Sequence, residues 1–169
     1  MATEAGVRIS VLGADDVAAW RAVRLEGLER YPGAFLSTPE EARAQPLDAI
    51  ARMLGRGNSF GAFQGGVLVG IGSLVPEGHA RTRHRGEIGA FYVTDAAQGS
   101  SAARDLLAAI EARARHLGIV QLELNVAANN PRAVRFYERS GYRHMATLRN
   151  AVMMPDGLVD DFLYAKELS

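Results

Sequence analysis

The feature that most constrains the fold is a sequence of three segments: a hydrophobic strand, a short loop of small residues, and an amphipathic helix that begins directly after the loop. Residues 85–93 are typical of a strand, and residues 95–101 form the loop. The helix after it carries apolar residues at helical spacing: Leu106, Leu107, Ile110, Ala114 and Leu117. Apolar residues then alternate over 122–126, which predicts a second strand. Strand, helix and strand in this order predict a right-handed crossover within one sheet.

Strand-like and helix-like segments also alternate through the rest of the chain. No linker, internal repeat or low-complexity stretch separates them, so we expect one domain spanning residues 1–169. The mixture of segments predicts an α/β (α+β by some schemes) fold with a mixed sheet flanked by helices. The further strands are expected at 7–11, 59–63, 67–74, 142–149 and 158–167, and the further helices at 17–30, 39–45, 47–54 and 131–140.

Composition excludes several classes of protein. Lys and Arg number 19, as do Asp and Glu, so the chain lacks the basic excess of nucleic-acid binders. There is no cysteine, which excludes disulfides, thiolate metal ligands and cysteine nucleophiles. The four histidines are far apart, so no metal site is predicted. The start of the chain lacks a secretory-signal pattern and no run of about 18 apolar residues occurs, so we expect a cytoplasmic protein without a membrane segment.

Two segments carry candidate chemistry. The loop at 95–101 and the start of the following helix present peptide N–H groups to one space, which is typical of a phosphate site, although a plain strand-to-helix turn explains the same residues. Further along, Asn130 precedes Tyr137 by seven residues, about two helical turns, so both can line one groove. The structural alternatives are a helix cap for Asn130 and a core aromatic for Tyr137.

In its order of elements and in these two segments, the chain resembles the GNAT superfamily of N-acetyltransferases. The pyrophosphate motif of that family, Q/R-x-x-G-x-G/A, corresponds to residues 98–103, where Gln98 and Ala103 conform and Ser101 replaces a glycine. The second family signature, N-x-x-A-x-x-x-Y-x-x-x-G-F/Y, is matched in full by Asn130, Ala133, Tyr137, Gly141 and Tyr142. The resemblance covers residues 60–145 well, and the first 55 residues only in kind.

The resemblance implies a mostly antiparallel sheet whose central strands, 85–93 and 121–126, splay apart to admit acetyl-CoA. Gly89 is the expected position of a bulge that starts the splay. A positive φ at Ser101 would cost about 1 kcal/mol relative to glycine and weaken CoA binding. Arg132 and Arg135 are candidates for the CoA 3′-phosphate, with a solvated helix face as the alternative for each. The implied acetyl-CoA-binding residues are Phe91, Tyr92, Val93, Gln98, Gly99, Ser100, Ser101, Ala102, Ala103, Asn130, Arg132, Ala133 and Phe136.

The implied reaction is direct transfer of an acetyl group to a primary amine of a small molecule or peptide. Tyr137 matches the general acid of the family, which protonates the departing thiolate. Glu87 is the candidate base, with an ion pair to Arg85 or Arg83 as the alternative. A backbone N–H at Val93 or its neighbour is expected to stabilise the oxyanion.

The acceptor is not specified by the sequence. It is expected near residues 32–54 and 149–163, where Asp156, Asp160 and Asp161 can attract a cation. Two other functions fit: a non-catalytic acyl-CoA-binding sensor of GNAT type, favoured by the Ser101 departure, and an unrelated α/β nucleotide-binding protein. No nucleic-acid, membrane or metal partner is expected, and a homodimer is left open.

Overall fold

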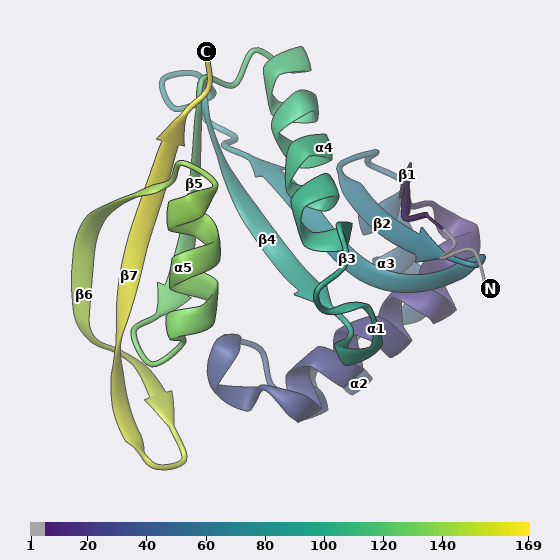
Figure 1. Cartoon of the computed structure of the whole chain (residues 1–169), viewed down its shortest axis with the longest axis horizontal. Coiled ribbons are helices and arrows are strands. Elements are labelled where there is room, and N and C mark those ends of the chain that lie inside the picture. Colours follow the sequence, from purple (N-terminus) through teal and green to yellow (C-terminus); the bar gives the residue numbers. More distant parts are fainter. Residues whose placement is uncertain (1–5) are drawn as a thin grey trace.

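A seven-stranded sheet of order β1-β2-β3-β4-β5-β7-β6 forms the centre of the computed structural model, which describes residues 6–169 (Figure 1). Residues 1–5, which the predicted domain includes, lie outside the described residues. Only β4 and β5 are parallel, and every other neighbouring pair is antiparallel, as predicted. The strands are β1 (Arg8–Val11), β2 (Ser59–Gln64), β3 (Val67–Pro76), β4 (Arg85–Val93), β5 (Gln121–Ala127), β6 (Arg143–Met154) and β7 (Gly157–Glu167).

Helices cover both faces of the sheet (Figure 1). On one face, Leu106 and Ile110 of α4 lie at the centre of the larger apolar cluster. On the other, Trp20 of α1 and Ile50 of α3 belong to a second cluster. The helices are α1 (Val17–Arg30), α2 (Pro39–Ala44), α3 (Leu47–Leu54), α4 (Ala102–His116) and α5 (Pro131–Arg139), with short 3-10 turns η1 (Ala14–Asp16), η2 (Pro32–Ala34) and η3 (Asp95–Ala97).

Side-chain caps fix two of the helix starts at the predicted positions. Before α2, the Thr38 hydroxyl accepts a hydrogen bond from the Glu41 amide, and the Glu41 carboxylate accepts one from the Thr38 amide. Before α5, the Asn130 side chain accepts a hydrogen bond of 3.2 Å from the Ala133 amide. Asn130 is therefore a helix cap, and its position at the start of α5 is set by that bond.

The strands β4 and β5 separate after a short paired stretch, as the splayed arrangement requires. Residues 85–87 pair with residues 121–123, and no further pairing joins the two strands. The ion pair between Arg85 and Glu123, 2.5 Å long, fastens the closed end. Beyond Glu87 the side of β4 that faces β5 is an open strand edge, and a V-shaped opening separates the strands (Figure 1).

A β-bulge within β4 exchanges the faces to which its side chains point. The register with β3 shifts there, and Ala90 has a φ of +46°. Ile88 accordingly packs in the α4 cluster, whereas Tyr92 packs against α1 and α3. The sequence predicts the bulge at Gly89, one residue too early. Gly89 instead provides close packing, because a Cβ there would lie 3.2 Å from the Ser73 hydroxyl, which donates to the Gly89 carbonyl.

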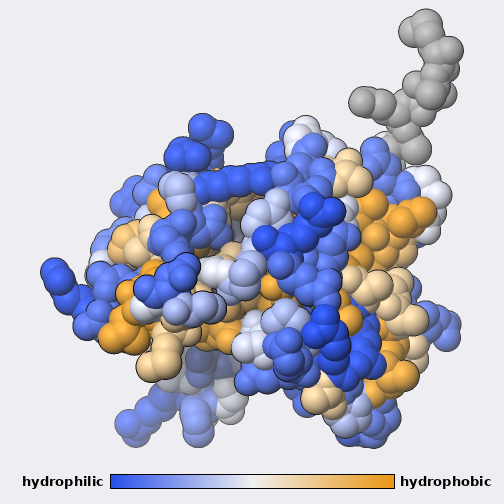
Figure 2. Space-filling view, turned by 90° about the horizontal axis from the view of Figure 1, so that it is seen from below, coloured by the Kyte–Doolittle hydropathy of each residue, from blue (hydrophilic) through white to orange (hydrophobic). Residues whose placement is uncertain are grey.

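The outer surface of the described chain is mixed in character. Figure 2, seen from below, shows hydrophilic residues (blue) over most of this side, with apolar residues (orange) in smaller areas between them. None of the helices within residues 6–169 has both the length and the apolar character needed to cross a membrane.

Candidate active site

A cavity of about 390 Å³ lies at the opening between β4 and β5, where α5, the loop before α4 and η2 meet. Tyr137 lines it, and so does every residue implied for acetyl-CoA binding except Ser101 and Ala102. Ala102 is fully buried in the apolar cluster around α4. Glu87 does not line this cavity. The two predicted catalytic side chains therefore lie in different spaces.

The loop before α4 presents alternate backbone amides without partners. Within residues 6–169, the amides of Gly99, Ser101 and Ala103 make no hydrogen bond, while the amides between them bond to other atoms of the loop. These free amides lie at the N-terminus of α4, where the helix dipole is positive. This set of donors suits a phosphate group.

The positive φ of this loop falls on Gly99 rather than on Ser101. Gly99 has a φ of +83°, whereas Ser101 has a φ of −74° and an ordinary helical backbone. The glycine that the loop conformation requires is therefore present. The replacement of the usual family glycine by Ser101 causes no backbone strain.

A hydrogen-bond network joins three elements around the mouth of the cavity. Arg132 at the start of α5 donates to the side-chain oxygen of Gln98 (2.7 Å), and the side-chain NH2 group of Gln98 donates to the Asp95 carboxylate (2.8 Å). Asp95 also accepts from the Tyr31 hydroxyl (2.6 Å) and pairs with Arg30 (2.7 Å) at the end of α1. Because Arg132 is exposed and bonds only a neutral amide here, its charge stays available to an anion.

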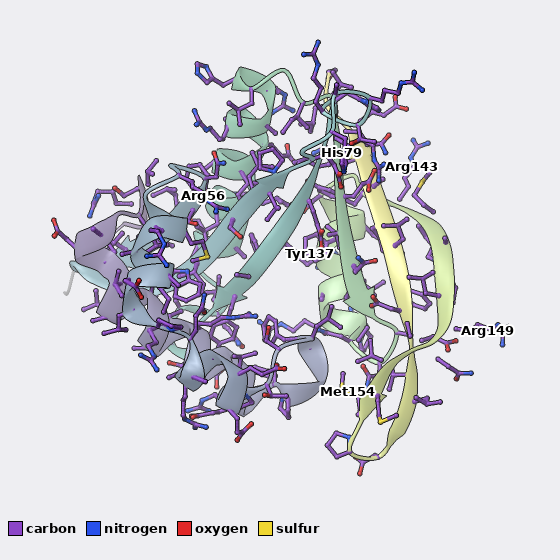
Figure 3. The ribbon with its side chains drawn as sticks, turned by 180° about the vertical axis from the view of Figure 1, so that it is seen from behind. Arg56, His79, Tyr137, Arg143, Arg149 and Met154 are labelled. Carbon is purple, nitrogen blue, oxygen red and sulfur yellow. The ribbon has the colours of Figure 1, made fainter. Side chains whose placement is uncertain are left out.

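Tyr137 projects from α5 towards the opening between β4 and β5 (Figure 3). Its ring packs against Phe91 (6.1 Å between centroids), Phe136 (5.1 Å) and Tyr142 (5.7 Å), and the residue is 8% exposed. The hydroxyl makes no hydrogen bond within the described part of the chain. Burial raises the pKa of Tyr137, so the phenol keeps its proton at neutral pH.

A second cavity of about 250 Å³ lies on the opposite face of the sheet. Leu124 belongs to the cluster around α4, so Asn125, the next residue of β5, points away from it and lines the second cavity. Glu87 of β4 and Asp161 of β7 line the same space. The two cavities share the η2 segment at residues 33–35 and therefore adjoin.

Glu87 makes no ion pair within residues 6–169, because Arg85 bonds both carboxylate oxygens of Glu123 instead. The alternative prediction, that Glu87 pairs with Arg85 or Arg83, is therefore wrong. The pKa of Glu87 is raised. The main cause is partial desolvation of its carboxylate, and the negative charges of Glu77, Glu123 and Asp161 add to it. A carboxylate with a raised pKa is a stronger base than an ordinary glutamate.

Of the three aspartates expected near the acceptor, one reaches the second cavity. Asp161 is buried there, and burial raises its pKa. Asp160 accepts a hydrogen bond from the Asn150 amide (2.8 Å), and Asp156 is exposed in the turn between β6 and β7. Met154, near the end of the same hairpin, also lines the second cavity (Figure 3).

Several lining residues have no signal in the sequence. Arg24 occupies an ordinary position in a helical pattern, yet its side chain lines the second cavity. Tyr31 and Phe35 flank η2 and line the first cavity. The Pro32-Gly33 turn marks only the end of α1, and the contact of this turn with the opening depends on tertiary packing.

A sheet opened between two parallel strands, with free amides at a helix N-terminus beside the opening, is the arrangement that the resemblance to the GNAT superfamily implies. The chain belongs to the acetyltransferase (GNAT) family, whose family model matches residues 20–142. No curated protein matches it significantly in sequence.

Solved structures share this fold over nearly the whole chain. One is yncA, a putative acetyltransferase from Salmonella typhimurium solved with its cofactor acetyl-CoA: TM-score 0.84, 18% identity, covering 97% of this chain and 95% of that one. A GNAT-family acetyltransferase from Streptococcus pneumoniae has a TM-score of 0.81 at 19% identity, covering 96% and 99%. The ribosomal-protein-alanine N-acetyltransferase from Brucella melitensis has a TM-score of 0.77 at 24% identity, covering 95% and 99%.

Proposed function

We propose that the protein is an acetyl-CoA-dependent N-acetyltransferase that moves an acetyl group directly to a primary amine of a small molecule or peptide. One catalytic domain spans residues 1–169. The observation that carries the proposal is the Tyr137 hydroxyl. It has no hydrogen-bond partner within residues 6–169 and lies in a cavity bounded by the open edge of β4 and by the free amides of the loop before α4.

The residues around the first cavity fit acetyl-CoA, which supplies an activated thioester. The amides of Gly99, Ser101 and Ala103 would hold the pyrophosphate, and Arg132 the 3′-phosphate. The open edge of β4 at residues 91–93 would pair with the pantetheine amides as an added strand does. The structural relative yncA, solved with acetyl-CoA, supports this choice of cosubstrate.

Each step of the transfer has a candidate group in this chain. Glu87 takes a proton from the ammonium of the acceptor, and the freed amine attacks the thioester carbonyl carbon. A backbone N–H at Val93 or its neighbour stabilises the oxyanion. As the carbon–sulfur bond breaks, Tyr137 donates its proton to the sulfur, and the nitrogen loses its second proton to solvent. Tyr137 then recovers a proton from solvent and Glu87 releases to solvent the proton that it took, so the products are an acetamide, CoA thiol and one proton.

The alternative of a non-catalytic acyl-CoA sensor loses its main support. That alternative rests on Ser101, whose φ of −74° makes a glycine unnecessary. The intact Tyr137 also favours catalysis over sensing.

The test is release of CoA thiol from acetyl-CoA in the presence of a panel of primary amines. We expect acetylation of at least one amine, with mass spectrometry showing a single added acetyl group. Acetyl-CoA binding without acetylation of any amine would favour the sensor. Light scattering in solution tests whether the protein forms a homodimer. Cell fractionation tests the predicted cytoplasmic location.

A further inference from the structure

The second cavity is lined by charged groups that form no ion pair in the described part of the chain. Three charged side chains line it: Arg24, Glu87 and Asp161. None of them forms an ion pair within residues 6–169. Asp161 is buried and Arg24 is half-buried, whereas Glu87 is exposed at the rim. Buried charges such as Asp161 are normally paired, because an unpaired charge loses its hydration without compensation. A ligand that carries both signs of charge would complete this cavity.

Arg24 is the unusual member of this group. Its Nη1 atom is buried and makes no hydrogen bond in the described part of the chain. The guanidinium lies over the Phe35 ring, 4.8 Å from the centroid. This cation–π contact holds the guanidinium in place without using its hydrogen-bond donors. Arg24 is thus a fixed cation with free donors, which suits a planar carboxylate.

The two carboxylates supply the opposite charge. Glu87 is the last residue of β4 that pairs with β5, and Asp161 comes from β7. Both have pKa values raised by burial, which an ammonium in the cavity would lower again. An ammonium held beside Glu87 lies next to the base that the proposed reaction requires.

We infer that the acceptor is a free α-amino acid, with its carboxylate on Arg24 and its ammonium at Glu87 and Asp161. This inference rests on the proposed function and names its substrate class. The product is then an N-acetyl amino acid, formed by the proton transfers described above.

The size and the remaining lining of the cavity agree with a free amino acid. Its volume of about 250 Å³ is below the range of about 300–1,000 Å³ typical of drug-sized ligands. Besides the polar residues Ser37 and Asn125, most of the remaining lining is apolar, including Leu36, Val152 and Met154, which suits an aliphatic or thioether side chain. The N-terminal residue of a peptide lacks the adjacent carboxylate, and a polyamine would place cations against Arg24.

The test compares acceptors that differ only in the carboxylate. L-alanine, L-leucine and L-methionine are each assayed beside their amides, at saturating acetyl-CoA. We expect kcat/KM for at least one acid to exceed that of its amide by about 10²-fold, because an amide leaves the Arg24 donors unpaired. The amine of an amino-acid amide is the less basic of the two, so easier deprotonation cannot produce this preference. Equal or faster turnover of all three amides would overturn the inference.

Variants assign the preference to Arg24. Arg24→Gln is expected to lower turnover of the preferred acid by about 10²-fold and to leave turnover of its amide within about 3-fold. Arg24→Lys keeps the positive charge and should retain part of the preference for the acid. This second variant keeps the test interpretable if Arg24→Gln does not fold. Arg52→Gln, an exposed residue of α3 whose side chain is 70% accessible, is the matched control and leaves both rates unchanged. A full acid preference in folded Arg24→Gln would contradict the assignment.

Calorimetry separates this inference from the proposed function. The three amino acids are titrated into wild-type protein that is saturated with CoA, and then into Arg24→Gln. Binding to wild type and its loss in the variant support the inference even without turnover. If acetyl-CoA binds and simple amines are acetylated, but none of the three amino acids binds, the inference fails and the proposed function stands.

Discussion

Replacing Tyr137 by phenylalanine removes one oxygen atom from the first cavity and leaves the ring contacts in place. If the hydroxyl protonates the departing thiolate, loss of this general acid should lower kcat by about 10²–10⁴-fold. That range corresponds to about 2.7–5.4 kcal/mol of transition-state stabilisation. The dissociation constant of acetyl-CoA should change by less than about 3-fold, because the ring still packs against Phe91 and Phe136.

The structure also limits the effect of this change on stability. The hydroxyl of Tyr137 has no hydrogen-bond partner within residues 6–169, so its removal breaks no bond there. We expect a change in unfolding free energy below about 1 kcal/mol, or about 2–4 °C in melting temperature. Tyr164→Phe is the matched control, since Tyr164 lies in the core and its hydroxyl donates to Glu138 (3.0 Å). That control should lose about 1 kcal/mol of stability and keep its kcat.

The assay is single-turnover and steady-state release of CoA thiol, with melting curves for each variant. Since burial raises the pKa of Tyr137 above its ordinary value of about 10, its ionisation should produce no basic limb in kcat below about pH 10. Near-normal kcat in a folded Tyr137→Phe protein would refute the assignment. A parallel fall in stability, binding and turnover would indicate a structural role instead.

Two further predictions concern the base and the phosphate loop. Glu87→Gln should lower kcat by about 10²-fold and abolish its acidic limb, which the raised pKa of Glu87 moves above the ordinary value of about 4.3. The raised pKa also means that ionised Glu87 destabilises the fold, so Glu87→Gln should have a higher melting temperature than wild type at pH 7. This difference in melting temperature should vanish below about pH 4, where Glu87 is protonated in both the folded and the unfolded protein. A lower melting temperature of the variant at pH 7 would contradict this. Gly99→Ala forces alanine to a φ of +83°, at a cost of about 1–2 kcal/mol, and should therefore weaken acetyl-CoA binding or lower the melting temperature. Ser101→Gly relieves no strain and should change the dissociation constant of acetyl-CoA by less than about 3-fold. Equal losses in both variants by calorimetry would refute this account of the loop.

Local patterns predict much of the fold, because each depends on a few neighbouring residues. The strand at Arg85–Val93 has the predicted bounds, and the caps at Thr38 and Asn130 start their helices where expected. The positions of Tyr137 and of the loop at 98–103 around one cavity also follow from the two motifs.

The division of the site between two faces of the sheet could not be predicted in this way. It depends on the bulge at Ala90, a residue type that rarely has a positive φ, and on the pairing of β7 with β5 and β6. That pairing turns Asp161 into the second cavity, while Asp160, its neighbour in sequence, bonds the Asn150 amide. The contact between Arg24 and Phe35 likewise depends on how η2 folds back on α1.

The measurement that tests the central claim most directly is the melting temperature of the wild-type protein with and without acetyl-CoA. For a dissociation constant near 10 μM, ligand at 1 mM should stabilise the fold by about 2.7 kcal/mol. A chain of this size should then melt about 5–10 °C higher, and CoA should compete for the same site. A melting temperature that stays unchanged at millimolar acetyl-CoA would contradict the proposal that the first cavity binds this cosubstrate.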